Sequence, residues 1–141
     1  MMPVETTSGV ENYETEPVNV TKIAKIMVVD DERSVGALIR IIMTRQGHEV
    51  QECYSPQEAL DKLMDNTYDV IILDIRMPGM SGIELLDEIK VRWPDMVSRV
   101  LFITGDTSDL STRTYLNTYN IPYLSKPFER RELEEKVNAL L

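Results

Sequence analysis

The stretch Tyr68-Asp69-Val70-Ile71-Ile72-Leu73-Asp74-Ile75-Arg76-Met77-Pro78-Gly79-Met80-Ser81-Gly82 decides the fold of this chain. Residues 70–73 form an unbroken apolar and mostly β-branched run, which is typical of a strand buried on both faces of a parallel sheet. The run ends on the carboxylate of Asp74, and the turn residues that follow stop the strand. Because open α/β sheets bind ligands at the carboxyl ends of their strands, Asp74 is the first candidate for a functional residue.

Strand and helix patterns alternate along the rest of the chain. Strands are expected over residues 25–30, 48–53, 70–74, 99–104 and 121–124, and the apolar positions that mark the helices lie within 35–43, 59–64, 83–92, 110–119 and 133–141. The helix over 110–119 has poor intrinsic propensity because it contains three Thr and two Tyr. Five strand–helix units joined by right-handed crossovers predict an α/β fold, with one parallel sheet and helices on both faces.

Composition limits the classes of protein that fit. The chain has 141 residues, enough for one domain with its own core, and its 43% of hydrophobic residues exclude wholesale disorder. The formal net charge of −9 disfavours direct binding of nucleic acid. No apolar run is long enough to span a membrane, and the single cysteine, Cys53, excludes an intramolecular disulfide, so a reducing cytoplasmic location is expected. Residues 1–22 are expected to form a disordered leader ahead of a domain over 23–141.

Polar residues of a particular kind stand at the ends of four expected strands: Asp30-Asp31, Asp74, Thr104 and, just past the fifth strand, Lys126. In a parallel sheet these side chains converge on one rim. Three carboxylates gathered there would repel one another unless a cation neutralised them, and all-oxygen ligation favours a hard divalent ion such as Mg²⁺. A lysine and a hydroxyl beside such an ion can hold the oxygens of a phosphoryl group. Asp74 is therefore the expected nucleophile for an acyl phosphate.

Together these residues resemble the response-regulator receiver domain of two-component signalling, over about residues 23–141. The resemblance rests on Val28-Val29-Asp30-Asp31-Glu32, on Asp74 with Met77-Pro78-Gly79 and Gly82, on Ile103-Thr104-Gly105, and on Tyr123-Leu124-Ser125-Lys126-Pro127-Phe128. The family implies a flavodoxin-like, doubly wound, five-stranded parallel sheet in the order 2-1-3-4-5 with five helices. It also implies that the Lys126–Pro127 peptide bond is often cis.

The resemblance implies a role for each residue at the rim. Asp74 would accept a phosphoryl group from a phosphohistidine on a histidine kinase or a histidine phosphotransfer protein. Asp30, Asp31, Asp74 and the backbone carbonyl of Arg76 would hold Mg²⁺, and Lys126 would contact the phosphoryl oxygens.

The resemblance also implies a conformational switch. Thr104 would move to hydrogen-bond the new phosphate, and Tyr123 would turn inward to fill the space that is vacated. Output to a partner, or through a homodimer, is expected at the face built by residues 110–141. The chain is then a switch rather than an enzyme, with self-phosphorylation and self-dephosphorylation as its chemistry. It is expected to be either a stand-alone regulator or a receiver from a larger protein, without an output domain within these residues.

Arg76 and Asp106 lie outside the motifs on which the resemblance rests. Arg76 lies two residues after Asp74, and Asp106 lies two residues after Thr104, so both flank the approach of a hydrolytic water. We hypothesise that the two side chains pair across the site and slow the loss of the phosphoryl group.

Three other readings compete with this one. A nucleotide-binding sheet would have a glycine-rich first turn, whereas this chain has Asp30-Asp31-Glu32 there. A Mg²⁺-dependent aspartyl-phosphate phosphatase commonly has a second Asp two residues after its nucleophile, where this chain has Arg76. A receiver-like binding module that is not regulated by phosphorylation is disfavoured by the complete set of motif residues, and stays open as an alternative.

Overall fold

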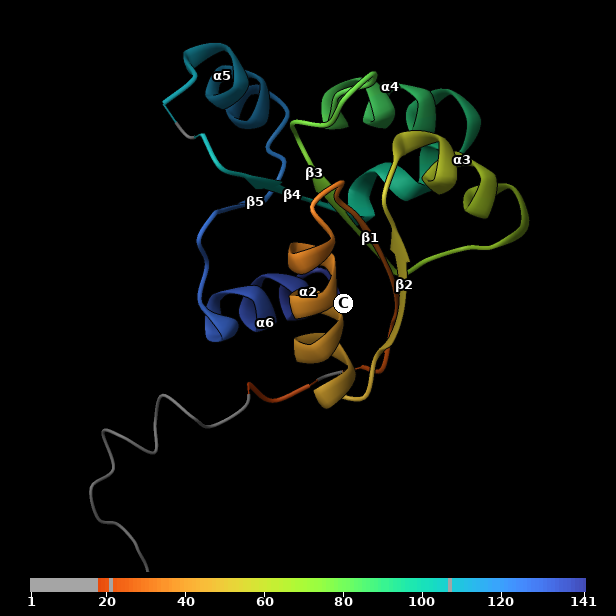
Figure 1. Cartoon of the computed structure of the whole chain (residues 1–141), viewed down its shortest axis with the longest axis vertical. Coiled ribbons are helices and arrows are strands. Elements are labelled where there is room, and N and C mark those ends of the chain that lie inside the picture. Colours follow the sequence, from red (N-terminus) through yellow and green to blue (C-terminus); the bar gives the residue numbers. More distant parts are fainter. Residues whose placement is uncertain (1–17, 21, 107) are drawn as a thin grey trace, which may run out of the picture.

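The computed structural model describes residues 18–20, 22–106 and 108–141, and it shows a five-stranded parallel sheet (Figure 1). The strands are β1 (Lys25–Val29), β2 (Glu49–Cys53), β3 (Val70–Asp74), β4 (Val100–Thr104) and β5 (Tyr123–Ser125). Their order in the sheet is β2-β1-β3-β4-β5, and every neighbouring pair is parallel. The flavodoxin-like order 2-1-3-4-5 is therefore confirmed.

Helices cover both faces of this sheet. The α-helices of the described residues are α2 (Arg33–Arg45), α3 (Pro56–Asp65), α4 (Gly82–Arg92), α5 (Leu110–Thr118) and α6 (Arg130–Ala139). Helices α2 and α6 pack on one face, and α3, α4 and α5 pack on the other, as Figure 1 shows. Each face has its own cluster of buried apolar side chains, so the sheet has a core on both sides.

Strand β3 lies in the middle of the sheet, and all five of its residues are buried. Ile71 and Leu73 point into the core under α3, α4 and α5, whereas Val70 and Ile72 point into the core under α2 and α6. Burying one such side chain stabilises the fold by about 1.5–3 kcal/mol. The strand that carries Asp74 is thus held firmly from both faces.

Side chains at the helix starts explain where the helices begin. Ser55 Oγ accepts the Glu58 N–H at 3.1 Å at the start of α3, where Ser55 is the N-cap residue. Helix α4 begins with a capping box between Ser81 and Glu84; Ser-x-x-Glu is the sequence signature of this motif, and the box was not predicted. Asp109 caps α5 by accepting the Ser111 N–H at 3.1 Å, and this cap supports a helix of poor intrinsic propensity.

Two elements differ from the prediction. Strand β5 begins two residues later than expected. The Ile121 N–H donates to Leu116 O at 2.9 Å and Pro122 has no N–H, so neither residue can donate a hydrogen bond to β4. A 3-10 helix, η1 (Pro94–Arg99), separates α4 from β4 and was not predicted. The Lys126–Pro127 peptide bond is cis, in agreement with what the resemblance implies.

The start of the chain is only partly described. The predicted disordered leader over residues 1–22 lies mostly outside the described residues and stays a prediction. Within the described part, the Val18 N–H donates to Glu134 Oε1 at 3.2 Å, and Gln46 Nε2 donates to Val18 O at 2.9 Å. None of the helices in the described residues is long and apolar enough to cross a membrane.

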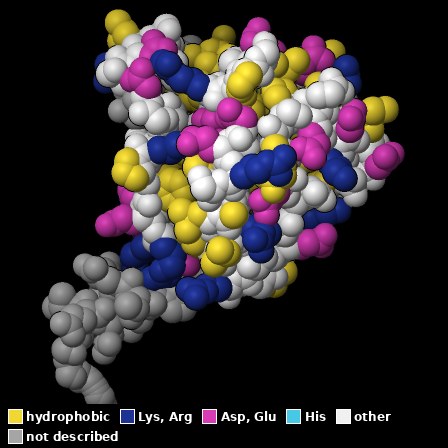
Figure 2. Space-filling model, in the orientation of Figure 1, with side chains coloured by type: hydrophobic (Ala, Val, Ile, Leu, Met, Phe, Trp, Pro, Cys, Tyr) yellow, Lys and Arg dark blue, Asp and Glu magenta, His cyan; other side chains and the backbone are white. Residues whose placement is uncertain are grey.

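The surface seen in the orientation of Figure 1 carries charges of both signs. Figure 2 shows basic and acidic side chains mixed over this face, with apolar side chains between them. Leu38 and Ile41 of α2 are each 46% exposed. This mixed pattern differs from the basic stripe that is typical of nucleic-acid binding.

Candidate functional site

The ends of four strands bring the predicted residues to one rim of the sheet. Asp74 and Thr104 are the last residues of β3 and β4, Asp30 and Asp31 follow β1 directly, and Lys126 follows β5. One carboxylate oxygen from each of the three acids lies within 4.8 Å of the other two. The three carboxylates that were predicted to meet at this rim therefore lie together.

Asp30 is fully buried, whereas Asp31 is exposed. Asp30 Oδ1 accepts a hydrogen bond from the Glu32 N–H at 2.9 Å. Asp30 Oδ2 has Lys126 Nζ at 3.0 Å as an ion pair but receives no hydrogen bond. The ion pair with Lys126 offsets part of the cost of burying this charge, and a cation ligated by the same oxygen would offset more of it. Three carboxylates with such an oxygen among them fit a hard divalent cation.

The pKa of Asp74 is raised above its ordinary value. Burial, followed by the negative charge of Asp30, raises the pKa of Asp74 to about 7, although Lys126 and the backbone N–H of Arg76 act in the opposite direction. The Asp74 residue is only 4% exposed, so water does little to stabilise its charge. The carboxyl is therefore incompletely ionised at neutral pH, and a cation bound to its oxygens would favour the ionised form.

The ammonium group of Lys126 lies among three carboxylates. Its Nζ is 3.0 Å from Asp30 Oδ2, 3.0 Å from Glu32 Oε1 and 3.5 Å from Asp74 Oδ1. Burial acts to lower the pKa of Lys126, but the hydrogen bond to Glu32 and the charges of Asp30 and Asp74 raise it overall. Lys126 therefore stays protonated at neutral pH. The contact with Glu32 was not predicted, although this residue directly follows the acidic pair.

The two predicted switch residues lie on neighbouring strands. Thr104 is buried, and its Oγ1 both accepts the Asp106 N–H and donates to Asp106 O, each at 3.2 Å. The Thr104 hydroxyl is thus hydrogen-bonded to the backbone of Asp106, in the loop that follows β4. Tyr123 is half-buried and pairs with Phe102 in the β4–β5 register, two residues before Thr104. The switching roles of Thr104 and Tyr123 stay predictions.

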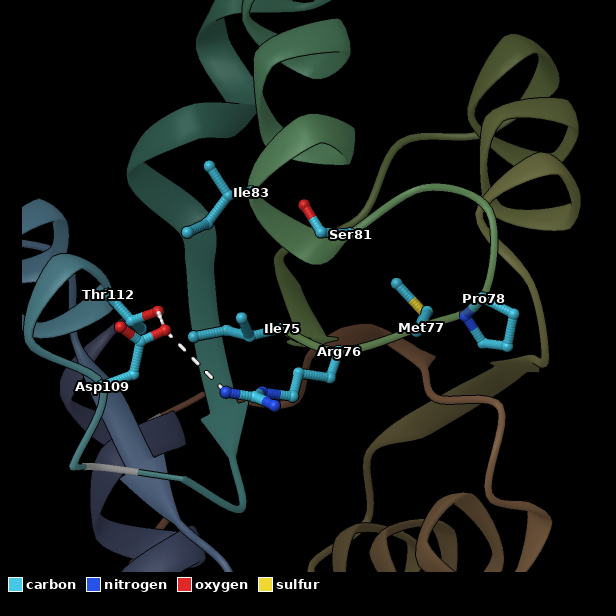
Figure 3. A pocket seen from close by; sticks show the side chains of 8 residues that line it. All are labelled: Ile75, Arg76, Met77, Pro78, Ser81, Ile83, Asp109 and Thr112. Atoms are coloured by element: carbon cyan, nitrogen blue, oxygen red, sulfur yellow. Dashed lines mark hydrogen bonds and ion pairs between the residues drawn. The ribbon is translucent and has the colours of Figure 1, made fainter.

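Arg76 and Asp106 form the ion pair that was expected from their spacing. Arg76 Nη2 lies 2.9 Å from Asp106 Oδ2 and 3.8 Å from Asp109 Oδ2. Figure 3 shows Arg76 reaching from the loop after β3 toward Asp109 at the start of α5. Hydrogen bonds from Ser108 hold the pKa of Asp106 below its ordinary value, so the pair stays charged at neutral pH.

The ion pair between Arg76 and Asp109 lies at a pocket of about 580 Å³ between the loop after β3 and the start of α5 (Figure 3). The pocket is lined by Ile75, Arg76, Met77, Pro78, Ser81, Ile83, Asp109 and Thr112. Asp109 was not predicted to be part of the site. An Asp directly before a helix is an N-cap signal that could have identified it.

The fold and the rim define a class of protein: a doubly wound α/β domain with an acidic pocket and a lysine at the carboxyl ends of its parallel strands. Comparison with known families then identifies the class. The response regulator receiver domain matches residues 26–138, and the chain belongs to this family, the phosphorylation-regulated receivers of two-component signalling. The match favours the receiver over the phosphatase considered from the sequence.

Curated relatives share the receiver region. The chain is 31% identical over 121 residues to the transcriptional regulatory protein ResD of Bacillus subtilis, covering 86% of this chain and 49% of ResD. It is 36% identical over 117 residues to YrkP of the same organism, an uncharacterized transcriptional regulatory protein, covering 83% of this chain and 49% of YrkP. The chain thus spans about half the length of these relatives.

Solved structures show the same fold. The response regulator TrrA of Thermotoga maritima, in complex with Mg²⁺ and BeF, has a TM-score of 0.73 and 33% identity, covering 84% of this chain and all (100%) of TrrA. A CheY-like receiver domain from Methanospirillum hungatei has a TM-score of 0.75 and 27% identity, covering 84% of this chain and 93% of that one.

Proposed function

We propose that this protein takes a phosphoryl group onto Asp74 from a phosphohistidine of a histidine kinase or a histidine phosphotransfer protein, in the cytoplasm. One observation carries the proposal: Asp74 lies in a cluster of three carboxylates whose oxygens are within 4.8 Å, with Lys126 Nζ at 3.5 Å. This arrangement combines a nucleophile, a divalent-cation site and a fixed positive charge, which are the parts that phosphoryl transfer needs.

Mg²⁺ is the proposed cofactor. Asp30, Asp31, Asp74 and the backbone carbonyl of Arg76 would hold it, and the buried Asp30 Oδ2 without a hydrogen bond supports this assignment. When bound, Mg²⁺ supplies positive charge that offsets the acids and the phosphoryl oxygens. The complex of the relative TrrA with Mg²⁺ and BeF supports a site of the same kind in this chain.

The proposed reaction is a displacement at phosphorus. A carboxylate oxygen of Asp74 attacks the phosphorus atom, and an O–P bond forms while the N–P bond to the donor imidazole breaks. The electron pair of that bond returns to the imidazole nitrogen, which takes up a proton. Lys126, with its ammonium already 3.5 Å from Asp74, donates a hydrogen bond to a phosphoryl oxygen and stabilises the charge that gathers there.

The proposed response to phosphorylation starts at Thr104. Its hydroxyl leaves the backbone of Asp106 for a phosphoryl oxygen, and Tyr123 turns into the space that is vacated. The phosphorylated site thereby favours one of two arrangements of the face built by α5, β5 and α6. That face would bind an output partner or a second copy of the chain.

Incubation with acetyl phosphate and Mg²⁺ is expected to add the mass of one phosphoryl group to the protein. The adduct should resist acid and be lost in base, as expected for an acyl phosphate, and it should not form when EDTA removes the cation. Intact-mass spectrometry measures both results. A folded protein that binds Mg²⁺, gains no mass and binds no beryllofluoride would contradict the proposal and favour the phosphate-independent binding module.

Arg76→Ala and Asp106→Ala are each expected to shorten the lifetime of phospho-Asp74 by about 2–5-fold, because the ion pair covers one approach for water. The Arg76 and Asp106 side chains are 64% and 38% exposed, so a larger effect is not expected. The decay of the adduct mass after removal of the donor measures the lifetime. Arg92→Ala, which breaks a similar exposed pair with Glu88 at 3.4 Å, is the control. Unchanged lifetimes in both variants would refute the shielding role.

A further inference from the structure

We propose that Glu32 is a positioning residue for Lys126, which favours binding of the divalent cation and opposes binding of the phosphoryl group. The inference rests on the proposed function and concerns a residue that has no role in it. It starts from the contact between Lys126 Nζ and Glu32 Oε1, which are 3.0 Å apart although the two residues are 94 positions apart in the sequence.

The carboxylate of Glu32 can bind Lys126 because it does not cap helix α2. Glu32 is the N-cap residue of α2, yet its side chain makes no capping hydrogen bond. Its backbone N–H is fixed by Asp30 Oδ1 at 2.9 Å, which places Glu32 at the edge of the acid cluster. The side chain is 60% exposed, so its charge lies on the solvent side of Lys126.

Lys126 has carboxylates on two sides. The Lys126 side chain is only 17% exposed, and Lys126 lines a pocket together with Val35, Leu38 and Phe128. Its Nζ forms a hydrogen bond with Glu32 Oε1 at 3.0 Å, while Asp74 Oδ1 lies at 3.5 Å and Asp30 Oδ2 at 3.0 Å as ion-pair partners. A small displacement of Nζ therefore decides whether its hydrogen bonds go to Asp74 or to Glu32.

A divalent cation among Asp30, Asp31 and Asp74 would repel this ammonium, which lies 3.0 Å from Asp30 Oδ2. Glu32 offers the displaced ammonium a charged acceptor outside the cluster, and its own negative charge attracts the cation. Both effects make cation binding more favourable.

A phosphoryl group on Asp74 reverses this preference. Its oxygens need the N–H donors of Lys126, and Glu32 competes for the same donors. The Glu32 carboxylate also repels the negatively charged phosphoryl oxygens. The same side chain is thus expected to strengthen the binding of the cation and to weaken that of the phosphoryl group, whereas a purely structural role would not separate the two.

The test compares wild type with Glu32→Gln, which keeps the shape and removes the charge. Isothermal titration calorimetry gives the affinity for Mg²⁺ alone, and then for beryllofluoride at saturating Mg²⁺. We expect the Mg²⁺ affinity of the variant to fall about 2–5-fold and its beryllofluoride affinity to rise about 2–5-fold, because the charge is largely exposed. Both differences should shrink in 0.5 M NaCl, which shortens the Debye length to about 4 Å.

Glu49→Gln is the matched control, since it removes one exposed acidic charge at the opposite end of the sheet, where β2 begins. It should leave both affinities unchanged. If wild type binds both probes and Glu32→Gln shifts them in the same direction, or shifts neither, the role of Glu32 is refuted and the proposed function stands. If wild type binds neither probe, the proposed function and this inference both fail.

Discussion

Asp74→Asn is expected to raise the free energy of unfolding of the cation-free protein at pH 8 by roughly 2–4 kcal/mol, and to abolish the phosphoryl adduct. The pKa of Asp74 is raised from 3.8 to about 7 in the folded protein, first by burial and then by the charge of Asp30. The folded state therefore holds the Asp74 proton more tightly than the unfolded state. The stability that this proton contributes is complete below about pH 4 and is lost as the pH rises through about 7. Asparagine is neutral at every pH and avoids that loss.

Urea unfolding in EDTA at pH 5 and pH 8 measures the effect. The advantage of Asp74→Asn over wild type should widen from pH 5 to pH 8, whereas Asp87→Asn, at an exposed position of α4, should show no such trend. Saturating Mg²⁺ at pH 8 should stabilise wild type more than Asp74→Asn, because the variant lacks one charged ligand. An advantage of Asp74→Asn that does not change with pH would show that the Asp74 carboxyl is ionised normally in the folded protein.

The alternation of apolar strands and amphipathic helices was sufficient to predict the sheet, its parallel direction and the rim where the acids meet. Val70–Leu73 illustrates the reason, because a strand covered on both faces has to be apolar at every position. The start of β5 was harder to predict, since it depends on a hydrogen bond from the Ile121 N–H to Leu116 O, which no strand pattern indicates. The order 2-1-3-4-5 came from the resemblance and not from the pattern.

The contacts around the rim were less predictable than the rim itself. Spacing was enough to pair Arg76 with Asp106, because each residue lies two positions after a strand-end residue of the rim, Asp74 or Thr104. The contact of Glu32 with Lys126 depends on how two loops 94 residues apart approach each other, and no local pattern encodes that distance. The residues of the rim could thus be predicted from the sequence, whereas the contacts of Lys126 with several carboxylates could be seen only in the structure.

Gly82→Ala is expected to lower the free energy of unfolding by about 3 kcal/mol or more, and to impair phosphorylation of the protein that remains folded. Gly82 is the first residue of α4, and its N–H donates to Ile75 O at 2.8 Å. A Cβ at this position would lie 2.3 Å from the backbone oxygen of Asp74 and 3.0 Å from its carbonyl carbon. Because β3 is held by a neighbouring strand on each side, its end resists displacement, so α4 has to shift or the end of β3 has to be distorted at a cost in stability.

Gly36→Ala, in the interior of α2, is the matched control. The nearest atom to its added Cβ is Glu52 Oε1 at 3.4 Å, the end of a flexible side chain, so alanine should change the stability by no more than about 1 kcal/mol and in the stabilising direction. Urea unfolding measures both variants, and the yield of the phosphoryl adduct at matched folded concentration shows whether Asp74 has moved. Wild-type stability in Gly82→Ala would mean that the loop between β3 and α4 yields easily. The close approach of Gly82 to Asp74 would then not be what holds Asp74 in place.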